Sequence, residues 1–377
     1  MNNSLRQQEK GGEAPAPPVQ RAAQPTFFLR TKLLPPRPAP SLLQRPRLIE
    51  RLQQNLLHPV TLVAANAGSG KTTLVADFVR THAQKFVWYQ LDHTDADPFV
   101  FLGYVAHGIK QAAPGFGEAT FAYLQSAANE LAQQPERVVD VLLNEVLDHF
   151  DQQFVLVLDD YHHLGTETAV HRVVDRLLAY LPDVMHVIII SRDVPPLAIA
   201  RMRTQSSLAV IDRNELLFTD EETRQLFRQV FDLELSTEQL AEYRERTHGW
   251  ITALQLVRQV AQRQALARGT QPAGDDATSP DLVEILRQSE RDIFDYFAEE
   301  VFADETEEVQ QFLLHVSLLE RVEPETCARL FPDAHASAML PMLVRRNVFI
   351  TLASDGRGEE YRLHPLFRGF LRRRLRN

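Results

Sequence analysis

The stretch from residue 60 to residue 83 constrains the fold of this 377-residue chain more than any other part. It reads VTLVA, then ANAGSGKTT, then LVADFVRTHA. A β-strand, a glycine-rich loop and an amphipathic helix in this order form a phosphate-binding loop, or P-loop. Glycines let successive backbone N–H groups converge on phosphate oxygens, and the helix N-terminus adds partial positive charge. The sequence therefore predicts an α/β P-loop fold that binds ATP or ADP.

Two side chains in this loop have distinct predicted roles. Lys71 would reach the β- and γ-phosphates, and the hydroxyl of Thr72 would bind Mg²⁺, a small hard ion that takes few protein ligands. Ala65 stands where the strict pattern has glycine. A glycine-rich turn with an incidental lysine is the alternative interpretation. The predicted contacts to the nucleotide come from Ala67, Gly68, Ser69, Gly70, Lys71, Thr72 and Thr73.

Charged residues follow two other β-rich runs. The run FVLVLDD, residues 154–160, ends in two aspartates. We expect Asp159 to hold Mg²⁺ through a water and Asp160 to orient or deprotonate an attacking water. The run HVIIIS is followed by Arg192, whose guanidinium would sense a γ-phosphate. A solvated turn after the first run and a surface arginine after the second are the alternatives.

The P-loop run belongs to a set of β-rich runs separated by helical segments. Three of them (TLVA, FVLVLD and HVIIIS) are apolar without alternation, which is typical of parallel strands covered by helices on both faces. The sequence predicts strands at Val60–Ala64, Phe86–Leu91, Phe154–Asp159, His186–Ser191 and Ser207–Ile211.

Composition divides the chain into further parts. Residues 1–25 are rich in Gln, Ala, Pro and Gly and predict a disordered tail before a P-loop domain with an N-terminal arm at 26–215. Residues 216–266 are helical, with the capping-box pairs Thr219/Glu222 and Ser236/Gln239. Residues 267–280 have linker composition. Residues 281–377 combine helices with the pair of runs NVFITL and YRLH, which predicts a winged helix.

Bulk properties exclude several classes of protein. The single cysteine, Cys327, rules out an intrachain disulfide, and the Cys and His residues lack zinc-site spacing. No apolar run approaches the roughly 18 residues that span a bilayer, and the N-terminus lacks the apolar core of a secretory signal. A net charge of −10 disfavours non-specific DNA binding. We expect a cytoplasmic protein that does not associate with membranes.

Several ordered motifs accompany the P-loop and the acidic strand end: LDHTDADPF, DDYHHL, SRDVPPLAIARMR, ELLFTDEE, RTHGWITALQL and RLHPLFRGFLRRRL. Together they resemble the nucleotide-binding core of the MalT-like (LuxR-type, ATP-dependent) transcriptional regulators, which belong to the STAND class of P-loop ATPases. The resemblance runs from Thr31 to Arg376. It implies a sheet of strand order 5-1-4-3-2, a helical domain and a winged-helix domain that close over ADP at rest. Exchange for ATP would open the module and permit oligomerisation.

The resemblance also implies roles for individual residues. His364 is similar to the winged-helix histidine that contacts the β-phosphate of ADP. Gly249 and Trp250 stand where related proteins line the adenine pocket, and Arg45 and Pro46 resemble the segment on the other side of the base. An ordinary half-buried histidine, a helix cap at Gly249 and core packing by Trp250 are the alternatives.

MalT-like regulators continue into a helical-repeat sensor and a helix-turn-helix domain, and neither is present in this sequence. We therefore expect the chain to be the switch module, with a natural short protein as the alternative to a piece of a longer regulator. Its expected partner is itself, with an inducer and DNA bound through those other domains.

Two further hypotheses stay open. A motor ATPase would share Lys71, Asp159 and Asp160 but would turn over well above about one ATP per second. A nucleotide-regulated DNA-binding winged helix would use the terminal arginines at 368, 372, 373, 374 and 376. Those arginines would equally form a solvated helix face, with the apolar residues Phe367, Phe370, Leu371 and Leu375 turned inward.

Overall fold

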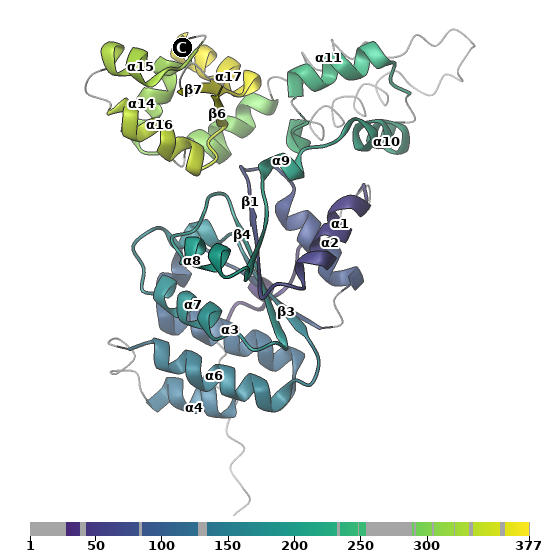
Figure 1. The fold of residues 1–377 in the computed structure, drawn as a ribbon, viewed down its shortest axis with the longest axis vertical. Helices are drawn as coiled ribbons and strands as arrows, with labels where there is room; N and C mark the ends of the chain where they lie inside the picture. The colour runs from purple at the N-terminus through teal and green to yellow at the C-terminus, as the bar shows by residue number, and fades with distance from the viewer. Residues whose placement is uncertain are drawn as a thin grey trace, which may run out of the picture.

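The computed structural model describes residues 28–37, 43–82, 85–126, 134–231, 234–247, 249–253, 289, 292–303, 305–319, 321–331, 335–354 and 359–376 (Figure 1). The predicted disordered tail at 1–25 and the predicted linker at 267–280 lie outside these residues.

The centre of the fold is a parallel five-stranded sheet. Its neighbours run in the order β2-β3-β4-β1-β5. This is the order 5-1-4-3-2 read from the other edge, so the predicted topology is confirmed. Each predicted run agrees with its observed strand to within one residue at either end. The strands are β1 Val60–Ala64, β2 Phe86–Gln90, β3 Phe154–Asp159, β4 Met185–Ser191 and β5 Leu208–Ile211.

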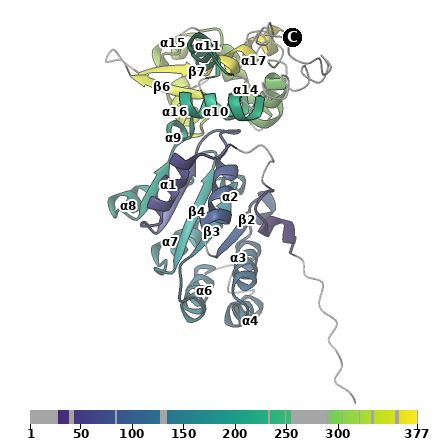
Figure 2. The ribbon, with the colours of Figure 1, turned by 90° about the vertical axis from the view of Figure 1, so that its right-hand side faces the viewer.

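Helices cover both faces of this sheet (Figures 1 and 2). Because successive side chains of a strand point to opposite faces, each strand contributes to two cores. Val155 and Val157 of β3 pack with α1 (Pro46–Asn55) and α2 (Lys71–His82), whereas Leu156 and Leu158 pack in the other core. That second core includes residues of α3 Pro98–Ala112, α4 Glu118–Ser126, α6 Glu136–His149 and α7 Val170–Ala179. The unbroken apolar runs in the sequence are thus explained.

The N-terminal arm carries a short 3₁₀ helix, η1 (Arg30–Leu33). Leu33 is buried in the larger core, and Lys32 forms an ion pair of 2.7 Å with the fully buried Asp95. The arm therefore lies along the sheet domain. The remaining short elements of this part are η2 His93–Ala96, η3 Tyr161–Leu164, α8 Ile199–Thr204 and α9 Arg213–Leu216.

Two helices follow the sheet, α10 (Asp220–Phe231) and α11 (Thr237–Thr247). Both predicted capping boxes are present. Thr219 and Glu222 exchange two hydrogen bonds of 3.0 and 3.1 Å, and Ser236 and Gln239 exchange two of 2.9 and 3.2 Å.

The C-terminal part has its own core and contains an antiparallel hairpin, so the predicted winged helix is observed. Three aromatic residues, Phe297, Phe349 and Phe367, are almost fully buried in that core. Its elements are η4 Ala298–Phe302 (a π-helical turn), α14 Glu307–Val316, α15 Pro324–Leu330, α16 Ala336–Arg345, β6 Ile350–Ser354, β7 Glu359–Leu363 and α17 Pro365–Arg376.

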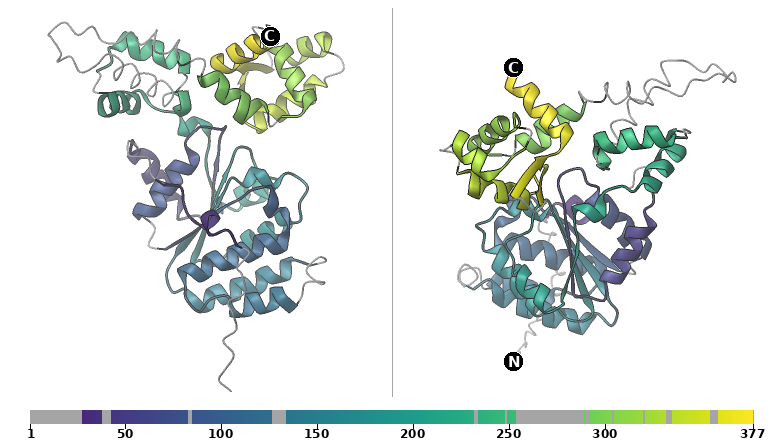
Figure 3. Two further views of the ribbon diagram at one scale, coloured as in Figure 1. Left: turned by 180° about the vertical axis from the view of Figure 1, so that it is seen from behind. Right: turned by 45° about the horizontal axis from the view of Figure 1, so that its top comes forward.

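The terminal helix α17 departs from the prediction at one residue. Phe367, Phe370 and Leu371 are buried as expected, but Leu375 is 37% exposed because it lies in the last turn, at the edge of the core. Figure 3 shows that α10, α11 and the winged helix lie together beyond one end of the sheet. In the part of the chain that the structure describes, none of the helices has the length and apolar character needed to cross a bilayer.

Candidate nucleotide-binding site

The P-loop connects the end of β1 to the start of α2, where Lys71 is the first helical residue. Gly68 and Gly70 have φ angles of +66° and +79°, in the left-handed region that favours glycine. Gly68 also meets a close neighbour, because a Cβ placed there would lie 2.0 Å from Oγ1 of Thr252. Both glycines thus hold the loop in a shape that a larger residue would strain.

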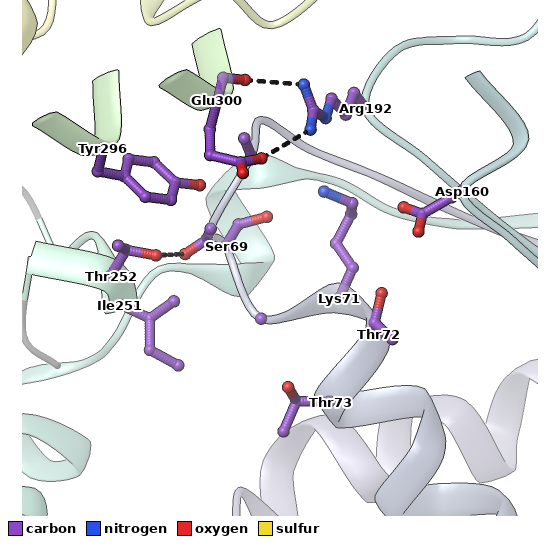
Figure 4. Close-up of a pocket in the computed structure, with 13 residues that line it drawn as sticks. Ser69, Lys71, Thr72, Thr73, Asp160, Arg192, Ile251, Thr252, Tyr296 and Glu300 are labelled. Carbon is purple, nitrogen blue, oxygen red and sulfur yellow. Dashed lines mark hydrogen bonds and ion pairs between the residues drawn. The ribbon is translucent and has the colours of Figure 1, made fainter. Parts of the chain in front are cut away.

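A cavity of about 240 Å³ lies against this loop (Figure 4). All seven predicted loop residues line it, and so do Asp160 after β3 and Arg192 after β4. The topology explains this gathering, since the carboxyl ends of parallel strands meet at one edge of the sheet. Four further lining residues come from later in the chain: Ile251, Thr252, Tyr296 and Glu300.

Lys71 is a buried cation in the wall of this cavity. Its Nζ donates hydrogen bonds to the backbone carbonyls of Ala65 at 2.6 Å and Asn66 at 2.9 Å. Burial, followed by the like charge of Arg192, lowers the pKa of Lys71 to about 8. A polyanion in the cavity would offset both effects, because it would supply a counter-charge to the two cations.

The residues predicted to bind magnesium lie side by side. The hydroxyl of Thr72 donates to Oδ1 of Asp159 at 2.9 Å. Asp159 is fully buried, and its Oδ2 has no hydrogen-bond partner among the described residues. Burial, followed by the charge of Asp160, raises the pKa of Asp159 to about 7. An unpartnered carboxylate oxygen beside a hydroxyl fits Mg²⁺, a hard cation that would satisfy that oxygen.

Asp160 and Arg192 reach the cavity from neighbouring strand ends. Asp160 has a φ of 58°, unusual for a residue with a side chain, and its Oδ2 accepts a hydrogen bond of 3.4 Å from Gln90. The guanidinium of Arg192 donates to the Glu300 carbonyl at 2.9 Å and to Glu300 Oε2 at 3.3 Å. The backbone carbonyl of Arg192 accepts from Asn347 at 2.8 Å. Arg192 therefore contacts the winged-helix part of the chain.

His364 does not line the cavity of about 240 Å³ beside the P-loop, which we call the phosphate cavity. It lines a smaller void of about 10 Å³ with Gly249 and Trp250, together with Asn66, Ser69, Arg213, Leu216, Leu217 and Ile251. Its Nε2 donates to the Thr247 carbonyl at 3.2 Å. Because Asn66 and Ser69 belong to the P-loop, His364 lies near the loop but on another side of it. A phosphate contact by His364 stays a prediction.

Trp250 combines core packing with a P-loop contact. Its indole Nε1 donates to the Ala67 carbonyl at 3.2 Å, and its ring stacks on Phe297 with centroids 5.0 Å apart. The hydroxyl of Thr252 donates to the Gly68 carbonyl at 2.7 Å. The segment after α11 is thus hydrogen-bonded directly to the P-loop backbone.

Arg45 and Pro46 take structural positions. The Arg45 guanidinium is buried and donates to Glu222 and to the carbonyls of Leu216 and Leu217. Pro46 is the first residue of α1. Neither residue lines the two cavities described above. Their contact with adenine stays a prediction.

Sequence reasoning did not single out Thr252, Tyr296 or Glu300. Thr252 stands in the quoted motif RTHGWITALQL without an assigned role, and Tyr296 and Glu300 lie outside the quoted motifs. Sequence reasoning also did not identify His162. This residue lines a neighbouring cavity of about 310 Å³ that shares Ala67, Arg192 and Glu300 with the first. Both ring nitrogens of His162 are buried without a hydrogen-bond partner among the described residues, and burial lowers its pKa to about 2. Two signals were its place two residues after Asp160 and its presence in the quoted motif DDYHHL.

Comparison with known proteins identifies relatives. Residues 298–377 match the family described as the MalT winged helix domain. The chain is 30% identical over 350 residues to the HTH-type transcriptional regulator MalT of Vibrio campbellii, which covers 92% of this chain and 36% of that protein. It is 30% identical over 330 residues to MalT of Yersinia enterocolitica, covering 88% of this chain and 35% of that protein. The chain thus spans about a third of the length of these relatives.

A solved structure supports the fold independently. The Walker-type ATPase of Pyrococcus abyssi is similar over 91% of this chain and 100% of that one, with a TM-score of 0.60 and 14% sequence identity. At this identity the similarity shows the fold alone, which is that of a P-loop ATPase. The predicted resemblance to the MalT-like regulators is confirmed by the sequence matches.

Proposed function

We propose that this MalT-like P-loop protein is a nucleotide switch of the STAND class. It binds ADP with Mg²⁺ in a closed resting state and ATP in an open state that self-associates. One observation carries the proposal: the phosphate cavity is walled by the sheet domain on one side and by Thr252, Tyr296 and Glu300 on the other. A nucleotide bound there would contact the sheet domain, the segment after α11 and the C-terminal part, which are the parts that opening would separate.

The contacts across the cavity explain how a nucleotide would act. A ligand shifts a conformational equilibrium only through a difference in its affinity for the two states. In the structure the hydroxyl of Thr252 donates to the P-loop and the guanidinium of Arg192 donates to Glu300, and we assign this arrangement to the proposed closed state. A bound nucleotide that preserves these contacts favours closure, and one that displaces them favours opening.

The chemistry of the site is that of slow ATP hydrolysis. Lys71 and the P-loop amides would bind the phosphates, while Thr72 and Asp159 would hold Mg²⁺, which neutralises charge on the phosphate oxygens. Asp160 would orient a water for attack on the γ-phosphorus, yielding ADP and phosphate. Arg192 would contact the γ-phosphate once it leaves Glu300. Turnover well above about one per second would instead favour a motor ATPase.

DNA binding by the winged helix receives less support. Arg372 donates to the Ser317 carbonyl at 2.8 Å, and the guanidinium groups of Arg373 and Arg374 lie over aromatic rings of the same part. These arginines take part in packing around α17. The relatives are named HTH-type transcriptional regulators, and we propose that this switch serves transcription control in the cytoplasm. DNA and inducer contacts would then belong to other parts of such a regulator.

The test is to identify bound nucleotide and then measure size. We expect the purified protein, once denatured, to release about one ADP per chain, and the native protein to be monomeric with ADP. A non-hydrolysable ATP analogue should increase its size. His364→Ala should release ADP faster and enlarge the associated fraction, whereas the exposed control His93→Ala should not. Absence of binding at millimolar nucleotide, or equal size with both nucleotides, would refute the switch.

A further inference from the structure

Glu300 lies where the phosphate cavity meets the winged-helix part of the chain (Figure 4). It belongs to η4, a single π-helical turn, a conformation that is rare and often marks functional sites. Its carboxylate and its backbone carbonyl both accept hydrogen bonds from the guanidinium of Arg192, at 3.3 and 2.9 Å. Glu300 therefore holds Arg192 at two points.

Arg192 is also held through its backbone. The side chain of Asn347, which follows α16, donates to the Arg192 carbonyl at 2.8 Å. Both anchors come from the C-terminal part, whereas Arg192 follows β4 of the sheet. If the guanidinium changed its partner, the contact between the sheet domain and the C-terminal part would lose its hydrogen bonds to Glu300.

The same guanidinium shares the cavity wall with Lys71. Lys71 and Arg192 both line this cavity, so their two positive charges face the same space. Glu300 is an anion at one end of this cationic region. Its carboxylate thus takes the position, relative to Arg192, that a phosphate oxygen would take.

We propose that Glu300 makes this site discriminate between nucleoside diphosphates and nucleoside triphosphates. The inference rests on the proposed function and adds the residue that separates the two ligands. A diphosphate held by Lys71 and the loop amides leaves the Arg192–Glu300 pair in place. A triphosphate places a third phosphate beside the Glu300 carboxylate, which repels it and competes with it for Arg192. Binding of the triphosphate then requires the pair to separate.

A purely structural ion pair would behave differently. The side chains of Arg192 and Glu300 are 24% and 52% exposed, and pairs this exposed contribute little to stability. Removing the Glu300 charge should therefore leave the thermal midpoint of unfolding unchanged and alter the relative affinity for the two nucleotides. A merely structural role of Glu300 would not change the relative affinity for the two nucleotides, so this ratio is the readout.

The experiment compares Glu300→Gln with wild type by titrating ADP and a non-hydrolysable ATP analogue in magnesium buffer. Glu299→Gln is the matched control, because Glu299 is exposed on the same turn and does not line the cavity. We expect Glu300→Gln to raise the ratio of triphosphate to diphosphate affinity by about tenfold, a typical coupling between sites. Glu299→Gln should leave the ratio unchanged. In an Arg192→Gln background, Glu300→Gln should have a much smaller effect.

Each outcome decides the matter. If wild type binds both nucleotides and Glu300→Gln leaves their affinity ratio unchanged, the inference is wrong while the proposed function stands. An equal rise of the ratio with and without Arg192 would contradict competition for the guanidinium. If wild type binds neither nucleotide, the proposed function fails and the role of Glu300 fails with it.

Discussion

Replacing Lys71 with methionine should change how the stability of the nucleotide-free protein depends on pH. Methionine keeps the apolar length of the side chain and removes its charge. The Lys71 residue is 7% exposed, and its pKa falls from 10.5 to about 8, chiefly because of burial. A difference of about 2.5 pKa units corresponds to roughly 3 kcal/mol, which is the cost of keeping this amine charged in the folded, nucleotide-free protein.

The direction in which the free energy of unfolding changes with pH follows from the number of protons bound by the folded and unfolded chains. Between pH 8 and pH 10.5 the unfolded chain carries a proton on Lys71 that the folded protein has lost. The free energy of unfolding therefore rises with pH across this window, and the full penalty is present below it. Wild type should gain about 2.5 kcal/mol relative to Lys71→Met between pH 7 and pH 10. Two lost hydrogen bonds, worth about 1 kcal/mol each, offset the penalty.

These magnitudes predict that the more stable of the two proteins at pH 7 is the less stable one at pH 10. The variant should be more stable than wild type by about 1 kcal/mol at pH 7 and less stable by about 1 kcal/mol at pH 10. Urea unfolding with EDTA and without nucleotide measures both differences, and the exposed Lys85→Met controls for general effects of pH. The same variant should lose binding of fluorescent ADP by at least about a hundredfold. A difference in stability that stays constant between the two pH values would refute the electrostatic reasoning.

Three further changes test other parts of the structure. Thr72→Ala should weaken the binding of ADP about tenfold in the presence of magnesium, because only its partner Asp159 would then hold the ion. Binding of ADP without magnesium, measured by calorimetry, should not change. Equal losses of affinity in both conditions would contradict this role. Arg45→Ala should lower the free energy of unfolding by about 3 kcal/mol, because Glu222 would lose its buried cation and keep only the more exposed Arg47 as a partner; Arg45→Ala with Glu222→Ala should recover most of that loss. Burial lowers the pKa of His186 to about 4, so the folded protein binds fewer protons than the unfolded chain below pH 6.5. Between pH 7 and pH 5 the free energy of unfolding of wild type should fall by about 2 kcal/mol more than that of His186→Gln. If urea unfolding shows the same change with pH in both proteins, the imidazole is not the cause.

The site contains two ionisable groups whose charged forms are in unfavourable surroundings. Lys71 has a lowered pKa and Asp159 a raised one, each mainly because of burial. Lys71 lines the cavity beside the P-loop, and Asp159 lies behind it, hydrogen-bonded to the lining residue Thr72. Perturbed groups of opposite sign in one region are typical of functional sites. A polyanion with a divalent cation would relieve both, which gives a physical reason for the nucleotide to stabilise this fold.

What the sequence predicted best is local in the chain. The P-loop is one continuous segment, and its strand, glycines and helix are specified by neighbouring residues. The five strands were predictable because parallel strands buried on both faces must be apolar throughout. The strand order came from resemblance to the MalT-like regulators, since periodicity does not specify which strands are neighbours.

The other side of the site was decided only by the tertiary structure. The sequence analysis assigned no role to Thr252 or Glu300, and they line the cavity because the later domains pack over the carboxyl edge of the sheet. The resemblance implies a contact of Arg45 with adenine, which stays a prediction, and only the fold shows its buried contact with Glu222 of α10. Sequence by itself determined the phosphate-binding backbone, because that geometry depends on φ angles and side chains within one short segment. The residues that face it depend on long-range packing, whose free energy is shared among many apolar contacts and leaves no motif at any single position.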